Sequence, residues 1–379
     1  MELLKLMEGW DSYKTISEIN KPADWDTRLT KLVELLANSS GMPRYRHEYL
    51  LREAMTTSDF PFLFGDALDR QVLAAYKAIE PEWKRYMRIS TVDRLFPNVG
   101  GRRFAIANSG MVLDEVPEKG EYKLVTKAET RYDVFARKYG NKLEISWETL
   151  LADDLGALKN TPNEMAWLSA NTEHFLAVSA YAGDIGTHAG GNLYQAGVNA
   201  GTLPLTIENL ETAVAAMQAF RHPSGQPMRN RPKYLVVSDG GLEMTARKIL
   251  TSAVQSFLIR GATDMPAMPV PTTNVISQYG LELIVDPWLS IVGPTGFTRR
   301  SWYLFAAPTM IAAIECDYLK GHERPEICMK ASNKVSIGGG DLGPMTGDFE
   351  SDNTLYRVRQ CFGANKLDWR ATYYSRVAD

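Results

Sequence analysis

Cysteine is scarce in this chain, with 3 in 379 residues. Cys316, Cys328 and Cys361 all lie in the last quarter of the sequence. So few thiols, placed so close together, do not make a disulfide framework. The scarcity predicts a protein that works in a reducing compartment.

Long apolar runs are also missing. The first fourteen residues mix acids with apolar residues and lack the basic segment and apolar stretch of a secretory signal. No stretch approaches the length of a membrane-spanning helix. We expect no membrane partner and synthesis in the cytoplasm.

An excess of either charge is absent. Lys and Arg number 42 and Asp and Glu number 45, which gives a formal net charge of -3. Such a chain has no global field to hold nucleic acid tightly, so a polycationic DNA binder is excluded. The hydrophobic fraction of 45% is enough to form the cores of two or three compact units.

Catalytic patterns are scarce as well. The string 338–343 matches the dinucleotide-binding GxGxxG pattern, but Pro344 follows where a helix should begin. Cys316, His322 and Cys328 offer three metal ligands without a CxxC or HExxH motif, so we interpret the cysteines as small apolar residues. The acidic pair Asp153-Asp154 and the dipeptide Ser238-Asp239 each precede a predicted helix, and both are typical of helix starts. We predict no catalytic, cofactor-binding or metal-binding residue.

The amino-terminal half contains an arm and a hairpin. Residues 1–60 hold one short amphipathic helix near 29–36, which is too short to fold alone, and a further helix is expected at 63–76. From residue 111 to 147 the pattern changes to period two, with a turn at 116–121. Two strands bury little by themselves, so this long charged hairpin must rest on its own subunit or on a neighbour.

The strongest helical signal follows the hairpin. A first piece is expected at 147–158, and Thr161, Pro162 and Glu164 form a capping box that predicts a long helix ending near Gly183. The glycine-rich segment after it is typical of a linker and predicts a domain boundary.

The remaining chain alternates helix and strand, which indicates helices packed on a small mixed sheet. Strands near the carboxyl end are expected to return to the first domain. The expected helices are 206–220 and 240–259, and the expected strands are 233–237, 281–285, 302–305, 310–315 and two within 351–374.

Several of these segments together resemble the major head subunits of tailed bacteriophages, in particular the Mu-type group. The most specific stretch is 116–122, then Tyr139-Gly140, then 145–157 with its Ile-Ser-x-Glu-x-Leu-x-x-Asp-Asp-Leu pattern. Further matches lie at 63–68, 205–217, 234–237 and 352–359. The likeness covers about residues 60–375.

The resemblance implies an α+β fold of the Hong Kong 97 type. Its implied parts are an N-terminal arm at 1–60, the first part of a P-domain at 61–110, an E-loop hairpin at 111–141, a P-domain spine-helix region at 142–185, a glycine-rich linker at 186–200, an A-domain at 201–334 and a carboxyl-terminal return to the P-domain at 335–379. It further implies self-assembly as hexamers and pentamers around packaged double-stranded DNA. The implied partners are a portal, a scaffolding function, a maturation protease and a decoration protein.

Three groups of residues become candidate functional sites on this interpretation. The first consists of the E-loop residues expected to contact neighbouring subunits: Glu118, Lys119, Glu121, Lys123, Lys127, Glu129 and Arg131. The second is a candidate hinge at Gly183, Gly186, Gly190 and Gly191. The third is a basic group expected to face a neighbouring subunit or DNA: Arg85, Arg88, Arg94, Arg102 and Arg103.

Two alternatives stay open from the sequence. One is a two-domain cytoplasmic enzyme with His188 or His222 as its base, in a cleft between the 201–334 unit and the rest. The other is a phage tail or baseplate structural protein, which would also lack a catalytic constellation.

Overall fold

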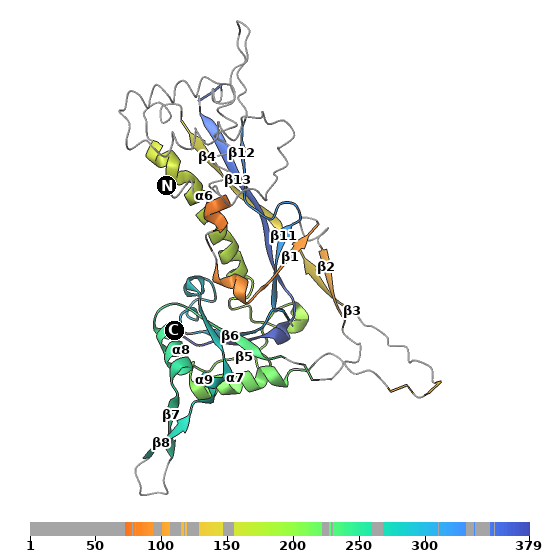
Figure 1. Cartoon of the computed structure of the whole chain (residues 1–379), viewed down its shortest axis with the longest axis vertical. Coiled ribbons are helices and arrows are strands. Elements are labelled where there is room, and N and C mark those ends of the chain that lie inside the picture. Colours follow the sequence, from red (N-terminus) through yellow and green to blue (C-terminus); the bar gives the residue numbers. More distant parts are fainter. Residues whose placement is uncertain are drawn as a thin grey trace. The chain divides into compact units, whose positions relative to one another are not determined.

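The computed structural model contains helices and strands throughout the residues that it describes (Figure 1). Those residues are 73–77, 79, 81–93, 101–106, 115–116, 118–119, 129–146, 155–221, 227–228, 230–259, 268–309, 311–330, 337, 349–351 and 353–379. The chain divides into two compact units. Unit 1 comprises Met1–Glu80, Lys138–Asn171 and His322–Cys361; unit 2 comprises Pro81–Arg137, Thr172–Gly321 and Phe362–Asp379. The predicted α+β class is confirmed.

Unit 1 is built on the first half of one long strand, β13 (Thr354–Lys366). Strands β4 (Arg137–Ile145) and β12 (Glu326–Met329) both pair with it. A small core joins the sheet to a helix, and its buried members are Tyr76, Met165, Ala166, Ala170 and Val358. Strand β4 passes so close to β13 that a Cβ on Gly140 would overlap the carbonyl oxygen of Val358. Glycine is therefore needed here for close approach of two backbones.

Helix α6 (Leu155–Ser179) is longer at its start than the sequence predicts. The capping box at Thr161 is wrong, because the helix is continuous from Leu155 and carries Pro162 in its interior. A proline there removes one helical hydrogen bond, which the remaining turns tolerate. The predicted end is confirmed: turns follow Ser179, and Gly183 has a φ of 67°, as helix-terminating glycines do.

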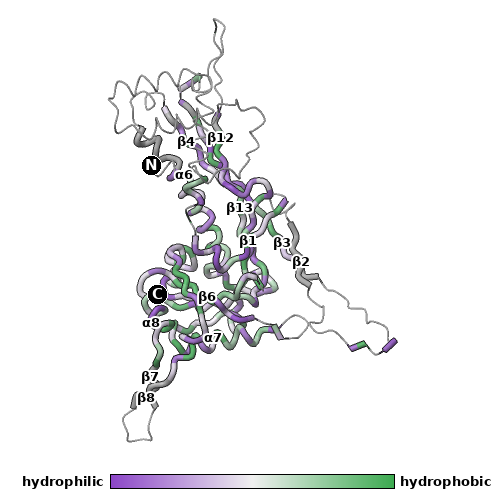
Figure 2. The backbone as a smooth tube through the Cα atoms, viewed as in Figure 1, coloured by the Kyte–Doolittle hydropathy of each residue, from purple (hydrophilic) through white to green (hydrophobic). Residues whose placement is uncertain are grey.

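Unit 2 contains a five-stranded mixed sheet in the order β5-β14-β10-β6-β9. Strand β10 lies at its centre, antiparallel to both neighbours, and all five of its residues are buried. The tube is largely hydrophobic around β6 in Figure 2. The strands are β5 (Ala200–Gly201), β6 (Pro232–Val237), β9 (Glu282–Val285), β10 (Trp302–Ala306) and β14 (Thr372–Ser375).

Three helices accompany this sheet: α7 (Ile207–Ala219), α8 (Gly241–Thr251) and α9 (Val275–Tyr279). Thr206 caps α7 by accepting a hydrogen bond from the Asn209 backbone N–H, so the predicted helix is confirmed. Leu210 and Met217 on its inner face are fully buried. The predictions of strands at 233–237, 281–285 and 302–305 are confirmed by β6, β9 and β10.

One predicted helix is half wrong. The expected helix at 240–259 ends as α8 at Thr251, and the chain continues as strand β7 (Val254–Ile259). The reason is a contact from downstream, since Asn274 donates hydrogen bonds to the carbonyl oxygens of Ile249 and Ser252 and so satisfies the end of α8. The expected cap at Ser238-Asp239 is also displaced, because the N-cap is Gly240, with a φ of 88°.

The sheet that contains β13 is five-stranded, and its members in unit 2 are β1 (Arg88–Val92), β11 (Ile314–Leu319) and the second half of β13. Strand β11 begins at Ile314, four residues later than the start of the strand expected at 310–315. A Cβ on Gly363 would overlap the carbonyl oxygen of Phe135, so this glycine too is required for close backbone approach. The two strands predicted within 351–374 are confirmed as β13 and β14.

Two ribbons complete unit 2, and each pairs with no third strand among the described residues. One joins β2 (Gly101–Ile106) to β3 (Glu129–Val134), and the other joins β7 to β8 (Met268–Thr273). No helix in the described part of the chain is both long enough and apolar enough to cross a bilayer.

Candidate intersubunit surfaces

The β2–β3 ribbon is the base of the predicted E-loop hairpin. Gly101 pairs with Val134 and Ile106 pairs with Glu129, so the midpoint of the chain between the two strands lies at residues 117 and 118. The described tip residues agree: Glu118 and Lys119 form an exposed turn, and Lys119 has a φ of 64°. The predicted turn at 116–121 is thus confirmed where it is described, while the strands begin ten residues earlier than the expected 111.

The hairpin is fixed to unit 2 at its base. Val134 and Ala136 are buried against Val92, and Leu367 packs on them. Burial, with the nearby Asp368 carboxylate, raises the pKa of Tyr132 to about 12. Among the described residues, the ribbon is therefore anchored at one end and exposed at the Glu118–Lys119 turn.

The other predicted E-loop contacts are less fully described. Glu129 and Arg131 lie on strand β3. Glu121, Lys123 and Lys127 fall outside the described residues. The role of all seven in subunit contacts stays a prediction.

Two members of the basic group have carboxylate partners. Arg85 forms ion pairs with Glu82 at 3.3 Å and with Glu282 at 2.8 Å. Burial works against its charge, but the hydrogen bonds to these two carboxylates prevail and raise the pKa of Arg85. Arg88 lies 3.8 Å from the buried carboxylate of Glu315 and donates to the Pro308 carbonyl oxygen. Part of the charge of this group is therefore already neutralised within the subunit.

The other three members of the basic group have no described side-chain contacts. Arg102 and Arg103 lie on strand β2. Arg94 falls outside the described residues. Contact of the group with DNA or a neighbour stays a prediction.

The glycine-rich segment after α6 is held by many hydrogen bonds. Asp184 accepts from the Leu193 backbone N–H at 2.7 Å and from Asn192 Nδ2 at 3.1 Å, and it pairs with Lys366 at 2.7 Å. A Cβ on Gly183 would overlap the ring of Pro294. This end of the segment is tied to two other parts of unit 2.

The far end of the segment is tied as firmly. Asn199 is fully buried and donates through Nδ2 to the carbonyl oxygens of Leu193, Trp369 and Thr372. Gly190 and Gly191 lie between these ties, in and after a 3-10 turn at His188–Gly190, and Gly186 packs beside Asn192. The hinge role of the four glycines stays a prediction. Movement at such a hinge would have to break the hydrogen bonds of Asp184 and Asn199.

His188, the first candidate base of the enzyme alternative, is part of this packing. Its ring stacks on Trp369 with centroids 4.2 Å apart, and Nδ1 lies 3.2 Å from the Asn192 carbonyl oxygen. Its Nε2 is buried without a hydrogen-bond partner. The ring thus serves packing in this arrangement. His222 falls outside the described residues.

A buried polar network was missed at the sequence level. Asp286 Oδ2 lies 2.8 Å from His174 Nε2 and accepts from Tyr86 at 3.3 Å, while Oδ1 accepts from the Trp288 backbone N–H. Tyr86 and Tyr181 contact each other through their hydroxyls, and burial raises the pKa of both well above the usual range. No local pattern signals this network, because its members are as much as 200 residues apart.

Two of the three residues weighed as metal ligands, Cys316 and His322, have other neighbours, and the third, Cys328, is exposed. Cys316 is buried beside the Met87 sulfur, and burial raises the pKa of its thiol. His322 contacts Glu326, which also pairs with Arg359. Within the described ranges, no group of three His, Cys, Asp or Glu side chains could hold a metal ion. The 338–343 glycine string and the acids at 153–154 lie outside the described residues.

Comparison with known proteins identifies the family. The family model for phage capsid proteins matches residues 131–375. No curated protein sequence matches the chain significantly.

Solved structures with a similar course of the chain include a chain of Gordonia phage Cozz, at 16% identity and a TM-score of 0.43, covering 77% of this chain and 85% of that one. A chain of Mycobacterium phage Ogopogo is 14% identical with a TM-score of 0.40, covering 78% and 93%. A virus-like particle from Pyrococcus furiosus is 10% identical with a TM-score of 0.43, covering 83% and 99%.

The family match runs from within β3 to the end of β14 and includes both halves of β13, which is well over half of the chain. It replaces the enzyme alternative with a structural role in the virion. The chain belongs to the phage capsid protein family.

Proposed function

We propose that this chain assembles into the icosahedral head shell of a tailed bacteriophage, as hexamers and pentamers, and encloses packaged double-stranded DNA. The observation that carries the proposal is the phage capsid family match over residues 131–375. The β2–β3 ribbon supports it, because a two-stranded ribbon that pairs with no third strand in the described part of the chain is marginal without a further surface.

The proposal includes the parts of the Hong Kong 97-type fold. On this view β2, β3 and the turn at Glu118 form the E-loop, α6 is the spine helix, and the five-stranded sheet with α7 to α9 is the core of the A-domain. The charged tip then rests on a neighbouring subunit. Each such contact is weak and is multiplied over the many copies of a closed shell.

The near-neutral charge fits a container. A strongly basic wall would hold DNA by counterion release and would hinder its exit. We propose assembly in the host cytoplasm with a portal, a scaffolding function and a maturation protease, and with a decoration protein outside. The Mu-type subgroup is part of the same proposal.

The test is to purify the full chain and to follow its particle size by light scattering and negative-stain electron microscopy. Closed shells of uniform diameter are expected as the concentration rises. Tubes or open rings would favour a tail or baseplate role. A small species that stays monomeric or dimeric at all concentrations would contradict the proposal.

The E-loop part has its own test. Glu118→Lys reverses the charge of an exposed tip residue without touching a core. We expect fewer or no shells and an unchanged thermal midpoint, because the tip contacts a neighbour and not its own subunit. Glu208→Lys, an exposed-surface charge reversal in α7, is the matched control and should assemble normally.

A further inference from the structure

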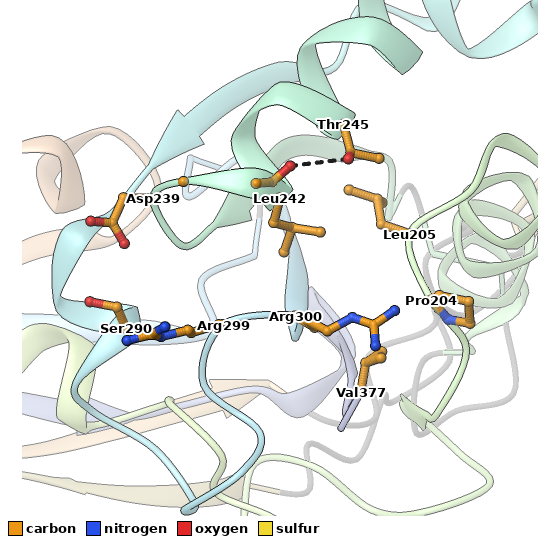
Figure 3. A pocket seen from close by; sticks show the side chains of 11 residues that line it. Pro204, Leu205, Asp239, Leu242, Thr245, Ser290, Arg299, Arg300 and Val377 are labelled. Atoms are coloured by element: carbon orange, nitrogen blue, oxygen red, sulfur yellow. Dashed lines mark hydrogen bonds between the residues drawn. The ribbon is translucent and has the colours of Figure 1, made fainter. Parts of the chain in front are cut away.

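A cavity of about 620 Å³ opens beside the first turn of helix α8. Its volume lies in the range of pockets that hold a ligand. The apolar part of its lining includes Leu205, Leu242 and Val377. The charged part consists of Arg299, Arg300 and Asp239. Figure 3 shows Leu242 on one side of the space and Arg300 on the other.

The loop that carries both arginines already binds a carboxylate through its backbone. The Asp379 side chain accepts hydrogen bonds from the N–H groups of Arg299 and Arg300, at 2.8 and 3.1 Å. It also accepts from the N–H and the hydroxyl of Thr298, both at 3.2 Å. Desolvation works against the charge of Asp379, but these hydrogen bonds prevail and lower its pKa. Successive N–H groups that converge on one anion in this way form a nest.

The segment that supplies this acid also supplies an apolar side chain to the cavity wall. Val377, two residues before Asp379, is buried and lines the space. The Val377 N–H donates to Ser301 Oγ at 3.1 Å, and the Asp379 N–H donates to the Gly296 carbonyl oxygen at 2.9 Å. An apolar residue and an acid two positions apart are thus bound together at this loop.

The arginine side chains of the loop face the cavity with their charge unused. Both side chains are exposed, and neither forms an ion pair with a carboxylate in the described part of the chain. Asp239 is the one acid among the described lining residues, so two guanidinium groups against one carboxylate leave the cavity with a net positive charge. A guanidinium stays protonated and can bind a carboxylate through two parallel hydrogen bonds.

The start of α8 adds donors that favour the same sign of ligand. Its N-cap, Gly240, makes no side-chain cap hydrogen bond, so no capping side chain satisfies the first N–H groups of the helix. A Cβ at Gly240 or Gly241 would meet nothing within 4 Å, so the backbone here is open to a ligand. The arginines and the helix start therefore both favour an anionic group in the space.

Exposed apolar side chains adjoin the cavity. Leu203, Met244 and Ile291 are 50%, 58% and 72% exposed, and each is the sequence neighbour of a residue that lines the space. Apolar side chains gathered at a cavity with a polar rim are typical of a protein–protein contact. A phosphate chain would leave them uncovered and would be repelled by Asp239. These surroundings favour an acidic peptide over nucleic acid.

We propose that this cavity binds an acidic, apolar peptide segment of a partner protein other than the shell subunit. An apolar side chain of the segment packs against Leu242, and a nearby carboxylate pairs with Arg299 and Arg300. The chain's own Val377 and Asp379 give the pattern for such a segment. Charge complementarity of this kind fixes orientation and excludes wrong partners. Binding requires only the folded subunit, so it goes beyond the proposed assembly.

Fluorescence anisotropy of labelled peptides tests the site on the purified chain. The probe is the peptide Ser-Leu-Ser-Glu-Ser-Leu-Ser-Glu, which places each leucine two residues before a glutamate, as Val377 stands before Asp379. A peptide with lysine in place of glutamate is the charge control. We expect the parent to bind the glutamate peptide at least about tenfold more tightly than the lysine peptide.

Two double variants test the arginines. Arg299→Gln with Arg300→Gln should weaken binding of the glutamate peptide by about tenfold or more, because hydrogen bonds between charged groups are lost. Arg299→Lys with Arg300→Lys keeps the charge and should retain most of the affinity. Arg247→Gln is the matched control, since Arg247 is an exposed arginine on α8 that does not line the cavity. Its affinity should equal that of the parent.

The apolar half of the site has its own variants. Leu242→Ser should weaken binding by about tenfold, since burial of a leucine side chain is lost. Leu203→Ser changes an exposed side chain at the rim, so it should weaken binding without lowering the thermal midpoint. Val275→Ser is the control, because Val275 is 59% exposed and does not line the cavity.

Three results would overturn the peptide site. One is a parent chain that does not bind the glutamate peptide at millimolar concentration. Another is equal affinity in the parent and the double glutamine variant. The third concerns a short double-stranded oligonucleotide: if the parent binds it more tightly than the peptide and the double glutamine variant does not, the cavity is a phosphate site.

Particle size of the same preparations keeps the two proposals apart. Shells formed by a chain that does not bind the peptide would overturn the peptide site and leave the capsid role standing. Arginine-dependent peptide binding by a chain that forms no shells would support the site, and the proposed function would fail.

Discussion

Strand β10 and the β7–β8 ribbon lie in the same unit but differ in how their strands are paired. All five residues of β10 are buried and a strand pairs on each side of it, whereas β7 and β8 pair with each other alone in the described structure. In β10 the backbone N–H and C=O groups find hydrogen-bond partners, and the side chains are buried, within one chain. The ribbon has no further strand to pair with among the described residues, and a ribbon of two strands alone is marginal in water.

The largest effect on stability is expected at the centre of the five-stranded sheet. Trp302→Ala removes a side chain that is 1% exposed and whose Nε1 donates to the Leu203 carbonyl oxygen. We expect the free energy of unfolding to fall by about 4 kcal/mol, measured by urea titration of unassembled protein. Ile291→Ala, at a side chain 72% exposed, should change it by less than about 0.5 kcal/mol. Equal losses from both variants would remove the contrast between buried and exposed side chains.

The buried Asp286 network should come next. Asp286→Ala leaves His174, the Tyr86 hydroxyl and the Trp288 backbone N–H without their acceptor. We expect a loss of about 3 kcal/mol in the same titration, because several buried donors lose a partner together. Tyr86→Phe removes one hydroxyl and should cost about 1 kcal/mol. If Asp286→Ala left the free energy of unfolding unchanged, the network would make no net contribution to stability.

A smaller loss is expected where backbones approach closely. Gly363→Ala forces a methyl group toward the Phe135 carbonyl oxygen, which should cost about 2 kcal/mol. Gly241→Ala meets open space at the start of α8 and should change the free energy of unfolding by less than about 0.5 kcal/mol. Thermal unfolding of the pair measures the difference, and the absence of one would mean that β13 can move away from Phe135.

The smallest effect is expected at Glu326 in unit 1. Partial burial raises the pKa of this carboxyl, but hydrogen bonds from His322 and Arg359 prevail and lower it below the usual value. Because the folded-state pKa is the lower one, the stabilisation is present above about pH 4.3 and is lost as the pH falls through the folded value. With Glu326→Gln, the free energy of unfolding that is lost as the pH falls should be smaller by under about 1 kcal/mol. The effect is small because solvent partly screens the site. An unchanged acid slope would contradict the assignment.

Local signals made much of the fold predictable. Thr206 marks the start of α7, and alternating or continuous apolar residues mark β6, β9 and β10. The hairpin turn near Glu118 was likewise evident from turn residues between two polar strands. In each case the determining residues lie within one element or beside it.

Non-local contacts explain the errors. Asn274 ends α8 from 22 residues downstream of Ser252, and no helical period contains that information. Strand β8 contains Pro269 and Pro271, which argue against a strand except at an edge, and a two-stranded ribbon consists of edges alone. The β7–β8 ribbon was missed for this reason.

The central claim is that one subunit folds alone and is completed by its neighbours. Its most direct test is the particle size of the purified chain and of Glu118→Lys at matched concentration, by light scattering and negative-stain microscopy. We expect closed shells from the parent and folded, unassembled subunits from the variant, with equal thermal midpoints. A parent chain that stays a small discrete species at every concentration would contradict it.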